Sequence, residues 1–175
     1  MMTKTRKLTL CALLVSVALV LSYMERFIPL QLVIPLPGIK LGLANIVSLI
    51  ALYLLGGKYA YCILVLRCML GSMFGGSITG LLFSLTGGSL AMLMMALAKR
   101  IPFLSIYGVS ILGAAAHNIG QICASMMIMH SVYIGAYLPY LLIIAIFTGL
   151  ATAAAGAGVL RALAQPDAPF MRGWK

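Results

Sequence analysis

The stretch ITGLLFSLTGGSLAMLMMALA, residues 78–98, decides the fold, and it is followed directly by Lys99 and Arg100. Its 21 residues contain no charged side chain. A helix of about 20 apolar residues is long enough to cross the hydrocarbon core of a bilayer, and Lys and Arg are enriched in the loops on the cytoplasmic side. The stretch therefore predicts a membrane-spanning helix that ends at the basic pair.

Apolar runs on both sides of this stretch predict an all-α membrane protein, a bundle of six transmembrane helices. The expected spans are residues 8–24, 41–55, 59–74, 78–98, 104–130 and 138–163. They form one membrane domain, 8–163, between a basic N-terminal segment, 1–7, and a tail, 164–175. The second span has only 15 residues. Either it tilts little in thinned lipid, or the loop before it dips into the membrane.

The composition excludes a water-facing globule and several kinds of enzyme. Of the 175 residues 63% are hydrophobic and 8% are charged, against about 25% charged residues in a soluble domain. The only acidic residues, Glu25 and Asp167, cannot build a carboxylate dyad or a multi-carboxylate magnesium site. The four cysteines lie in apolar runs without a C-x-x-C pair, so we interpret them as buried hydrophobes. No catalytic site, metal or cofactor is expected.

The basic residues predict the orientation of the chain in the membrane. Twelve Lys and Arg residues against two acidic ones give a net charge of +10. With both termini in the cytoplasm, only Arg26 and Lys40 lie outside, and the positive-inside bias is satisfied. Nine then lie inside: Lys4, Arg6, Lys7, Lys58, Lys99, Arg100, Arg161, Arg172 and Lys175. Because the charges are spread over helix ends and not gathered on one face, nucleic acid is not an expected partner.

The first outer connection, residues 25–40, is long and apolar. Pro29, Pro35 and Pro37 exclude a regular helix there. Irregular backbone at membrane depth is tolerated only where protein buries it or where it lines a cavity. The connection is therefore either a lid over an outward-facing pocket or a loop in the headgroup layer.

Arg67 is the one cation inside an apolar run, near the centre of the third expected span. It stays charged, so it needs a carboxylate, several carbonyl groups, water or an anionic ligand as a partner. Glu25 is the only carboxylate outside the tail. Arg67 is therefore either paired with Glu25, which is a structural role, or the counter-charge of a ligand.

The fifth expected span carries a polar cluster, His117, Asn118 and Gln121, which Ser125 extends by one turn. Residues three or four positions apart share a helix face. The cluster is either a ligand-facing stripe or a set of interhelical hydrogen bonds. Asn45, early in the second span, is a further candidate ligand contact. Cationic and donor groups outnumber carboxylates, which favours an anionic or neutral polar ligand.

A transporter with this sequence would need another protein to supply energy. The nearest match to a nucleotide-binding P-loop, Gly57-Lys58, is preceded by Leu52 where glycine is required and followed by Tyr59. The spans also lack the central carboxylates that proton-coupled pumps use.

Two motifs, IPLPGIKLGLAN at 34–45 and AHNIGQ at 116–121, resemble the heptaprenyl diphosphate synthase component I family, also called the Gx transporter family. The resemblance covers about residues 8–163. Further matches are SYME at 22–25, LR at 66–67, SLTGGS at 84–89, GVS at 108–110 and YLP at 137–139. Met24 and Arg26 depart from the family pattern, because smaller residues are usual beside the glutamate.

That family is similar to the substrate-binding S components of energy-coupling factor (ECF) transporters of the bacterial plasma membrane. The resemblance implies six helices and a ligand bound from outside beneath the first outer loop, with Glu25, Pro37 and Gly38 in the lid. It implies that Lys40 and Asn45 lie at the pocket mouth. It further implies that Ala12 and Ser16 dock a transmembrane coupling subunit, which acts with cytoplasmic ATPases and makes the small subunit topple.

The family label also suggests an accessory subunit of a polyprenyl diphosphate synthase. The chain could only be a non-catalytic partner there, because prenyl transfer needs aspartate-rich magnesium sites and the sequence has one aspartate. A third alternative is a purely structural membrane subunit. A pocket lined by Lys40, Asn45, Arg67, His117 and Gln121 would favour a binding protein, and internal pairing of those groups would favour the structural role.

Overall fold

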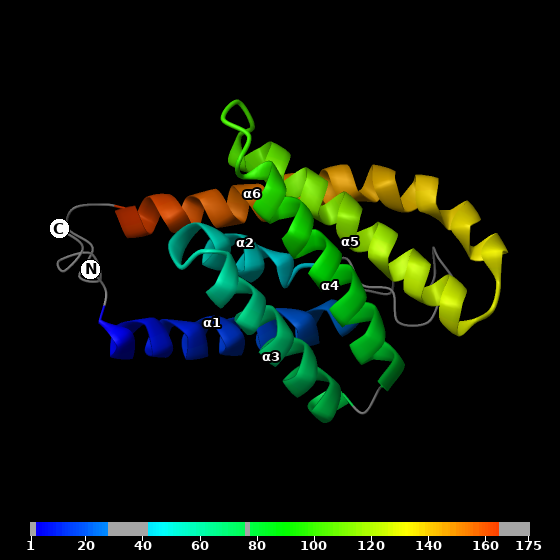
Figure 1. Ribbon diagram of the computed structural model, residues 1–175, viewed down its shortest axis with the longest axis horizontal. Helices are drawn as coiled ribbons and strands as arrows, with labels where there is room; N and C mark the ends of the chain where they lie inside the picture. Colours follow the sequence, from blue (N-terminus) through cyan, green and yellow to red (C-terminus); the bar gives the residue numbers. More distant parts are fainter. Residues whose placement is uncertain (1–2, 28–41, 76–77, 165–175) are drawn as a thin grey trace.

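A computed structural model describes residues 3–27, 42–75 and 78–164, and within these ranges it contains helices and turns and no strand (Figure 1). The chain runs through six α-helices, α1 (Lys4–Met24), α2 (Asn45–Leu54), α3 (Gly57–Gly75), α4 (Ile78–Ala98), α5 (Ile106–Ile128) and α6 (Leu138–Ala164). Two short 3-10 helices, η1 (Glu25–Phe27) and η3 (Val132–Tyr137), follow α1 and precede α6. The predicted all-helical fold with six helices is confirmed.

Four of the described helical segments are long and apolar enough to cross a membrane: α1, α4, α5 and the continuous segment Val132–Ala164. The protein is therefore a multi-pass membrane protein by helix length and hydropathy. α3 has the length of a span but contains Lys58 and Arg67, and α2 has only 10 residues. The six predicted spans thus correspond to six helices. Four of the described helical segments are long and apolar enough to cross a membrane.

The short helix α2 lies in the interior of the bundle, where it contacts each of the other five α-helices. Seven of its 10 residues are buried, and at 1.5 Å per residue it is about 15 Å long. A helix that protein surrounds need not match the thickness of the bilayer, and irregular backbone before it is tolerated for the same reason. The expected span 41–55 is therefore a shorter, internal helix, preceded by a turn at residues 43 and 44.

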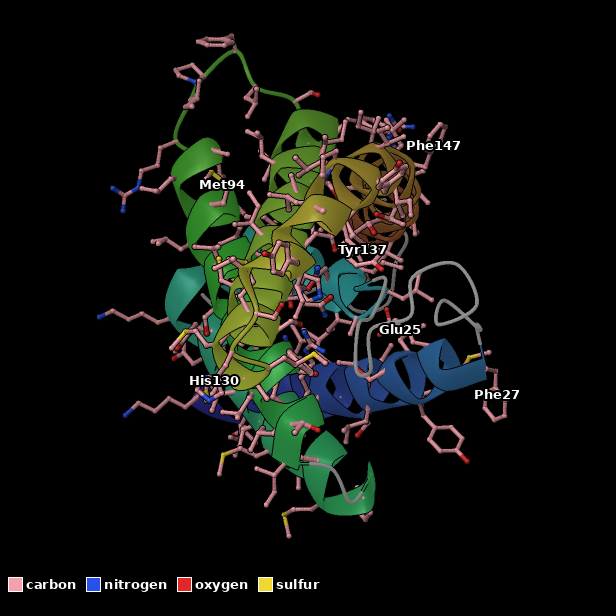
Figure 2. The ribbon with its side chains drawn as sticks, turned by 90° about the vertical axis from the view of Figure 1, so that its right-hand side faces the viewer. Glu25, Phe27, Met94, His130, Tyr137 and Phe147 are labelled. Atoms are coloured by element: carbon pink, nitrogen blue, oxygen red, sulfur yellow. The ribbon has the colours of Figure 1, made fainter. Side chains whose placement is uncertain are left out.

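The other five helices carry apolar side chains on their outer surfaces. Phe74 on α3 and Phe147 on α6 are 83% and 69% exposed, and Met94 points away from α4 (Figure 2). Exposed apolar surface this extensive is unusual for a protein in water. It is the surface expected of helices that face lipid tails.

Helix ends differ from the predicted boundaries where a cap stops or starts the helix. Lys4, Arg6 and Lys7 belong to α1 and are not a separate segment before it, because the Thr3 hydroxyl accepts a hydrogen bond from the Arg6 amide at 3.4 Å and caps the helix. Ser105 caps α5 in the same way, so the fifth helix begins two residues later than expected. The tail from residue 165 onward lies outside the described residues.

Two lysines at helix ends contact neighbouring elements. The start of α1 lies beside the start of α3, because Lys7 Nζ is 5.6 Å from the centre of the Tyr59 ring. Directly after α4, Lys99 Nζ donates a hydrogen bond to the backbone oxygen of Leu52 at 2.9 Å. Desolvation lowers the pKa of Lys99. In Figure 1 the beginning of α1 and the end of α6 lie at the same side of the bundle.

Glycines let α4, α5 and α6 approach closely. A Cβ atom built on Gly120 of α5 would lie 2.8 Å from Gly87 Cα of α4. One built on Gly149 of α6 would lie 2.6 Å from Ile111 Cα of α5. In both cases the obstacle is backbone, which cannot move aside as a flexible side chain can. Small residues at such crossings are typical of packed membrane helices.

We expect Gly149→Ala to destabilise the bundle, because α5 and α6 must separate to admit the methyl group. Overpacking of this kind costs about 1–3 kcal/mol. The matched control is Gly158→Ala on the same helix, where nothing lies within 4 Å of the added atom. Thermal unfolding in detergent measures both variants. An unfolding temperature of Gly149→Ala that equals the control would contradict the close crossing.

Candidate functional site

A polar cluster lies in the interior, where α5 passes α2 and α4. His117 and Gln121 are 2% and 0% exposed, and they share one face of α5 as their spacing predicts. Gln121 Nε2 lies 3.0 Å from His117 Nε2. The two side chains therefore form one hydrogen-bonded unit.

Two glycines bring backbone against this unit. A Cβ atom on Gly87 of α4 would lie 2.9 Å from Gln121 Cγ and 3.1 Å from His117 Cε1. Gly42, just before α2, has a φ of +81°, and a Cβ atom there would lie 2.7 Å from Asn45 Nδ2 and 3.2 Å from His117 Cδ2. Any larger residue at Gly42 would be strained as well as obstructed. The structure thus brings Asn45 together with His117 and Gln121.

Hydroxyl and amide oxygens around the cluster have spare hydrogen-bonding capacity. Asn45 Oδ1, Ser48 Oγ on α2 and Ser125 Oγ on α5 are buried, and none of them has a hydrogen-bond partner among the described residues. Buried polar atoms are paired in the great majority of cases. These atoms are therefore available to a bound molecule or to water. Ser125 continues the predicted stripe by one turn.

Asn118 points to another neighbour. It is buried, and its Nδ2 donates a hydrogen bond to the backbone oxygen of Leu141 on α6 at 2.8 Å. Consecutive residues differ by about 100° around a helix, so Asn118 cannot face the same way as His117. Of the three polar side chains predicted on this helix, Asn118 makes the interhelical bond.

We expect Asn118→Ala to lower the free energy of unfolding by about 0.5–1.5 kcal/mol, the net contribution of a typical buried hydrogen bond. The side chain links α5 to α6 through its bond to Leu141, whereas His117 and Gln121 are hydrogen-bonded to each other. Unfolding in detergent with increasing denaturant measures the change. A variant as stable as the wild type would show that the bond to Leu141 contributes nothing.

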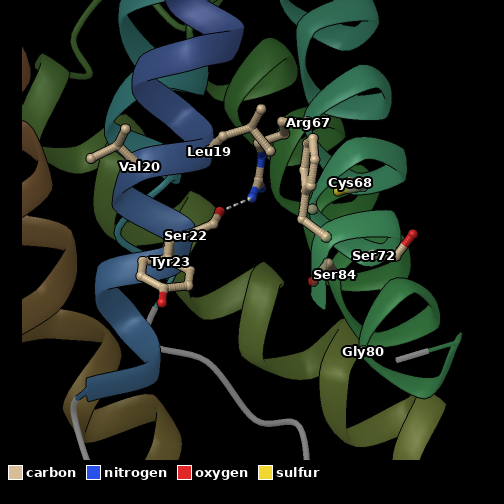
Figure 3. Close-up of a pocket in the computed structure, with 11 residues that line it drawn as sticks. Leu19, Val20, Ser22, Tyr23, Arg67, Cys68, Ser72, Gly80 and Ser84 are labelled. Carbon is tan, nitrogen blue, oxygen red and sulfur yellow. Dashed lines mark hydrogen bonds between the residues drawn. The ribbon is translucent and has the colours of Figure 1, made fainter. Parts of the chain in front are cut away.

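Arg67 lies in a separate cavity of about 320 Å³ between α1, α3 and α4 (Figure 3). Ser22 of α1 and Ser84 of α4 line the cavity with it, whereas Asn45, His117 and Gln121 are not among its described lining residues. The structure therefore does not gather all the predicted site residues in one pocket. It divides them between a packed central cluster and an open cavity.

The predicted alternative of a Glu25–Arg67 ion pair is not formed. Arg67 is 5% exposed, and its Nη1 donates to Ser22 Oγ at 3.2 Å. Among the residues that the structure describes, Nε and Nη2 have no hydrogen-bond partner, and no carboxylate pairs with the guanidinium. An arginine at the centre of a membrane helix costs about 2.5–3.5 kcal/mol on insertion scales, so this arrangement is a costly one.

Glu25 closes the base of the first outer connection instead. Its carboxylate accepts a hydrogen bond from the backbone N–H of Leu43, and the residue is 6% exposed. Glu25 points into the bundle, whereas Phe27 points away from it (Figure 2). Gly42, at the end of the connection before α2, lies against His117 of the polar cluster. The expected lid residues Pro37 and Gly38, and Lys40, lie outside the described residues.

Ala12 and Ser16, the expected docking residues, lie one turn apart on the exposed face of α1. Ser16 Oγ donates to the backbone oxygen of Ala12 at 3.0 Å, so the helix itself satisfies the hydroxyl. α1 is the least buried of the four candidate spans. The small residues thus leave a shallow, apolar strip on the outside of the bundle.

The sequence analysis did not identify Gly42 and Gly87 as neighbours of His117, or Ser22 as the partner of Arg67. A signal for each was present, because all three lie within the motifs that carried the family resemblance. A glycine in such a motif indicates a close approach of backbone, which the structure supplies at His117. The described residues contain no group of three or more His, Cys, Asp or Glu side chains that could hold a metal.

Comparison with known proteins gives one match. The model of a family described as heptaprenyl diphosphate synthase component I matches residues 14–159. The matched range includes the polar cluster and Arg67 but begins just after Ala12. No curated protein and no solved structure matches the chain.

Proposed function

Because the chain belongs to the heptaprenyl diphosphate synthase component I family, we propose that it is the substrate-binding S component of an ECF-type uptake transporter. It captures a small anionic or neutral polar metabolite from outside the cell. It then docks a transmembrane coupling subunit, and cytoplasmic ATPases supply the energy. The protein itself catalyses no reaction.

The observation that carries this proposal is the central cluster of Asn45, His117 and Gln121. These groups are buried, Gly42 at the end of the connection between α1 and α2 lies against Asn45 and His117, and Asn45 Oδ1 has no hydrogen-bond partner in the described structure. A few convergent polar groups in an apolar surrounding are typical of small-molecule sites. The segment 28–41, with Pro37, Gly38 and Lys40, would then cover the bound molecule.

The charge distribution supports an orientation with both termini in the cytoplasm. Lys7 and Lys99 mark one end of the bundle, at the starts of α1 and α3 and the end of α4. By the positive-inside bias this end faces the cytoplasm. Glu25, at the other end of α1, then lies on the outer side, where a ligand arrives. All six helices would cross or enter the membrane in this arrangement.

Transport in this proposal needs the small subunit to topple after docking. Ala12 and Ser16 would form the contact, because small residues let a partner helix approach closely in lipid. Toppling would turn the cluster around His117 from the outer to the inner side. The sequence contains no nucleotide-binding loop, so the energy must come from the partner's ATPases.

Native mass spectrometry of the purified protein tests the proposal. We expect one small polar molecule to remain bound to each chain, in addition to any lipid. A protein that carries only lipid and detergent, even after purification from cells grown in rich medium, would count against a substrate-binding subunit.

The family description favours a second candidate, a non-catalytic membrane partner of a polyprenyl diphosphate synthase. The catalytic subunit would then be another protein, since this chain has two acidic residues in all. The two candidates differ in the partner that they require: a coupling subunit with ATPases in one case, and a soluble prenyltransferase in the other.

A further inference from the structure

The polar cluster is closed to any molecule in this structure. Gln121 is 0% and His117 is 2% exposed. Asn45 Oδ1 and Ser125 Oγ are buried as well, although they have no hydrogen-bond partner among the described residues. Because a buried polar atom without a partner is costly, these groups favour a state in which a molecule pairs with them. Some part of the surrounding wall must therefore move before a molecule can reach them.

Two stretches of backbone form the wall beside the imidazole. One is Gly87 of α4, a helix of 21 residues that crosses α5 closely at this point. The other is Gly42, at the start of the turn 42–44 that precedes α2. A Cβ atom on Gly42 would lie 3.2 Å from His117 Cδ2 and 3.3 Å from His117 Nε2, the nitrogen that Gln121 contacts. Because a turn opens at lower cost than a long packed helix, the turn 42–44 is the wall that we expect to move.

Glu25 ties this turn to the end of α1. Its carboxylate accepts a hydrogen bond from the backbone N–H of Leu43, 18 positions further along the chain. The backbone of Glu25 is itself fixed, because its N–H donates to the oxygen of Leu21 in the last turn of α1. Glu25 is 6% exposed, and its side chain points into the bundle (Figure 2). The bond is thus a buried connection between α1 and the backbone that covers His117.

The carboxylate is an unusual choice for such a connection. Glu25 is the only acidic residue that the structure describes. Acidic side chains inside membrane proteins are expensive and mark functional places. A hydrogen bond to a carboxylate is stronger than one between neutral groups, so it keeps a turn closed most of the time. A single bond of this kind still opens without unfolding of the bundle.

We propose that Glu25 is a positioning residue that controls access to the polar cluster. It holds the turn 42–44 on the His117–Gln121 pair, and a molecule reaches the pair only while the bond between Leu43 and Glu25 is open. The inference rests on the proposed function, in which this cluster binds the transported molecule. The carboxylate acts through the backbone of the turn, so it sets how fast a molecule enters and leaves.

Acylation of the two histidines by diethyl pyrocarbonate tests the proposal. The full-length protein, washed in detergent to remove bound molecules, is treated briefly, and peptide mass spectrometry measures the reaction at His117 and at the exposed His130. In the wild type His130 should react while His117 stays protected. Glu25→Ala should raise the rate at His117 by roughly 10–100-fold, the factor by which loss of a hydrogen bond to a charged group shifts an equilibrium. The rate at His130 should not change.

Three further variants separate positioning from general stability. Glu25→Gln keeps a carbonyl oxygen for the N–H of Leu43, so it should restore most of the protection. Glu25→Asp is one methylene group shorter and replaces Glu25→Ala if that protein does not fold; it should raise the rate at His117 part of the way. Gly149→Ala destabilises a different crossing, so its His117 should stay protected.

An unchanged rate at His117 in both Glu25→Ala and Glu25→Asp would overturn the proposal. An equal rise in Gly149→Ala, or a Glu25→Gln protein as reactive as Glu25→Ala, would overturn it too. Native mass spectrometry of unwashed wild-type protein keeps this test apart from the proposed function. A wild type without a bound polar molecule would contradict the substrate-binding subunit, whereas the histidine reaction would still decide the role of Glu25.

Discussion

His117→Ala protein is expected to lose the small polar molecule that the wild type retains through purification. The imidazole is the centre of the buried cluster, with Gln121 hydrogen-bonded to it and the backbone of Gly42 and Gly87 packed on it. Loss of one hydrogen-bond partner that leaves the other buried and unpaired weakens binding by roughly 10–100-fold. Native mass spectrometry of the two proteins, purified side by side, measures the loss.

Gln121→Ala should give the same loss, because it removes the other half of the hydrogen-bonded pair. Asn118→Ala is the matched control: it removes a polar side chain next in sequence that contacts α6 and not the pair. The control should keep the bound molecule although it is less stable. Full retention in both His117→Ala and Gln121→Ala would mean that the cluster is a structural feature of the bundle.

Ala12→Trp is expected to abolish assembly with a coupling subunit while leaving ligand retention unchanged. Ala12 and Ser16 form a shallow strip on the exposed face of α1, and an indole ring there would hold a partner helix away. Since the strip faces outward, the substitution should not disturb the interior of this subunit. Co-purification in a mild detergent measures assembly.

The control for the docking test is Phe147→Trp on α6, at another exposed apolar position. It introduces the same ring on a helix that the proposal does not use for docking, and it should assemble as the wild type does. Loss of assembly in both variants would indicate a general effect of bulk on the outer surface. Normal assembly of Ala12→Trp would remove α1 from the docking contact.

The helices and their apolar outer surface could be predicted from the sequence because both follow from local pattern. Residues 78–98 form α4 with the predicted bounds, since an uncharged run of spanning length ends at a basic pair. The interior position of α2 could not be predicted, because a short apolar run reads the same whether lipid or protein surrounds it. The interior position of α2 follows only from the packing of the other five helices around it.

The polar residues of the candidate site could be predicted from the sequence, but the separation of Arg67 from His117 and Gln121 could not. The spacing of His117 and Gln121 was sufficient to place them on one face of α5, whereas the partner of Asn118 depends on where α6 lies. Arg67 and His117 are 50 positions apart in the sequence, and no local pattern specifies whether they share a pocket. That depends on the three-dimensional arrangement of α3, α4 and α5.

The composition of the complex purified with this protein tests the central claim most directly. The tagged full-length chain, extracted from its own membranes in a mild detergent, is analysed by quantitative mass spectrometry of its stoichiometric partners. A substrate-binding subunit predicts a transmembrane coupling protein together with ATPase subunits, all of which are absent from the Ala12→Trp sample. A soluble prenyltransferase in their place, retained equally by Ala12→Trp, would contradict the transport function and favour the synthase partner.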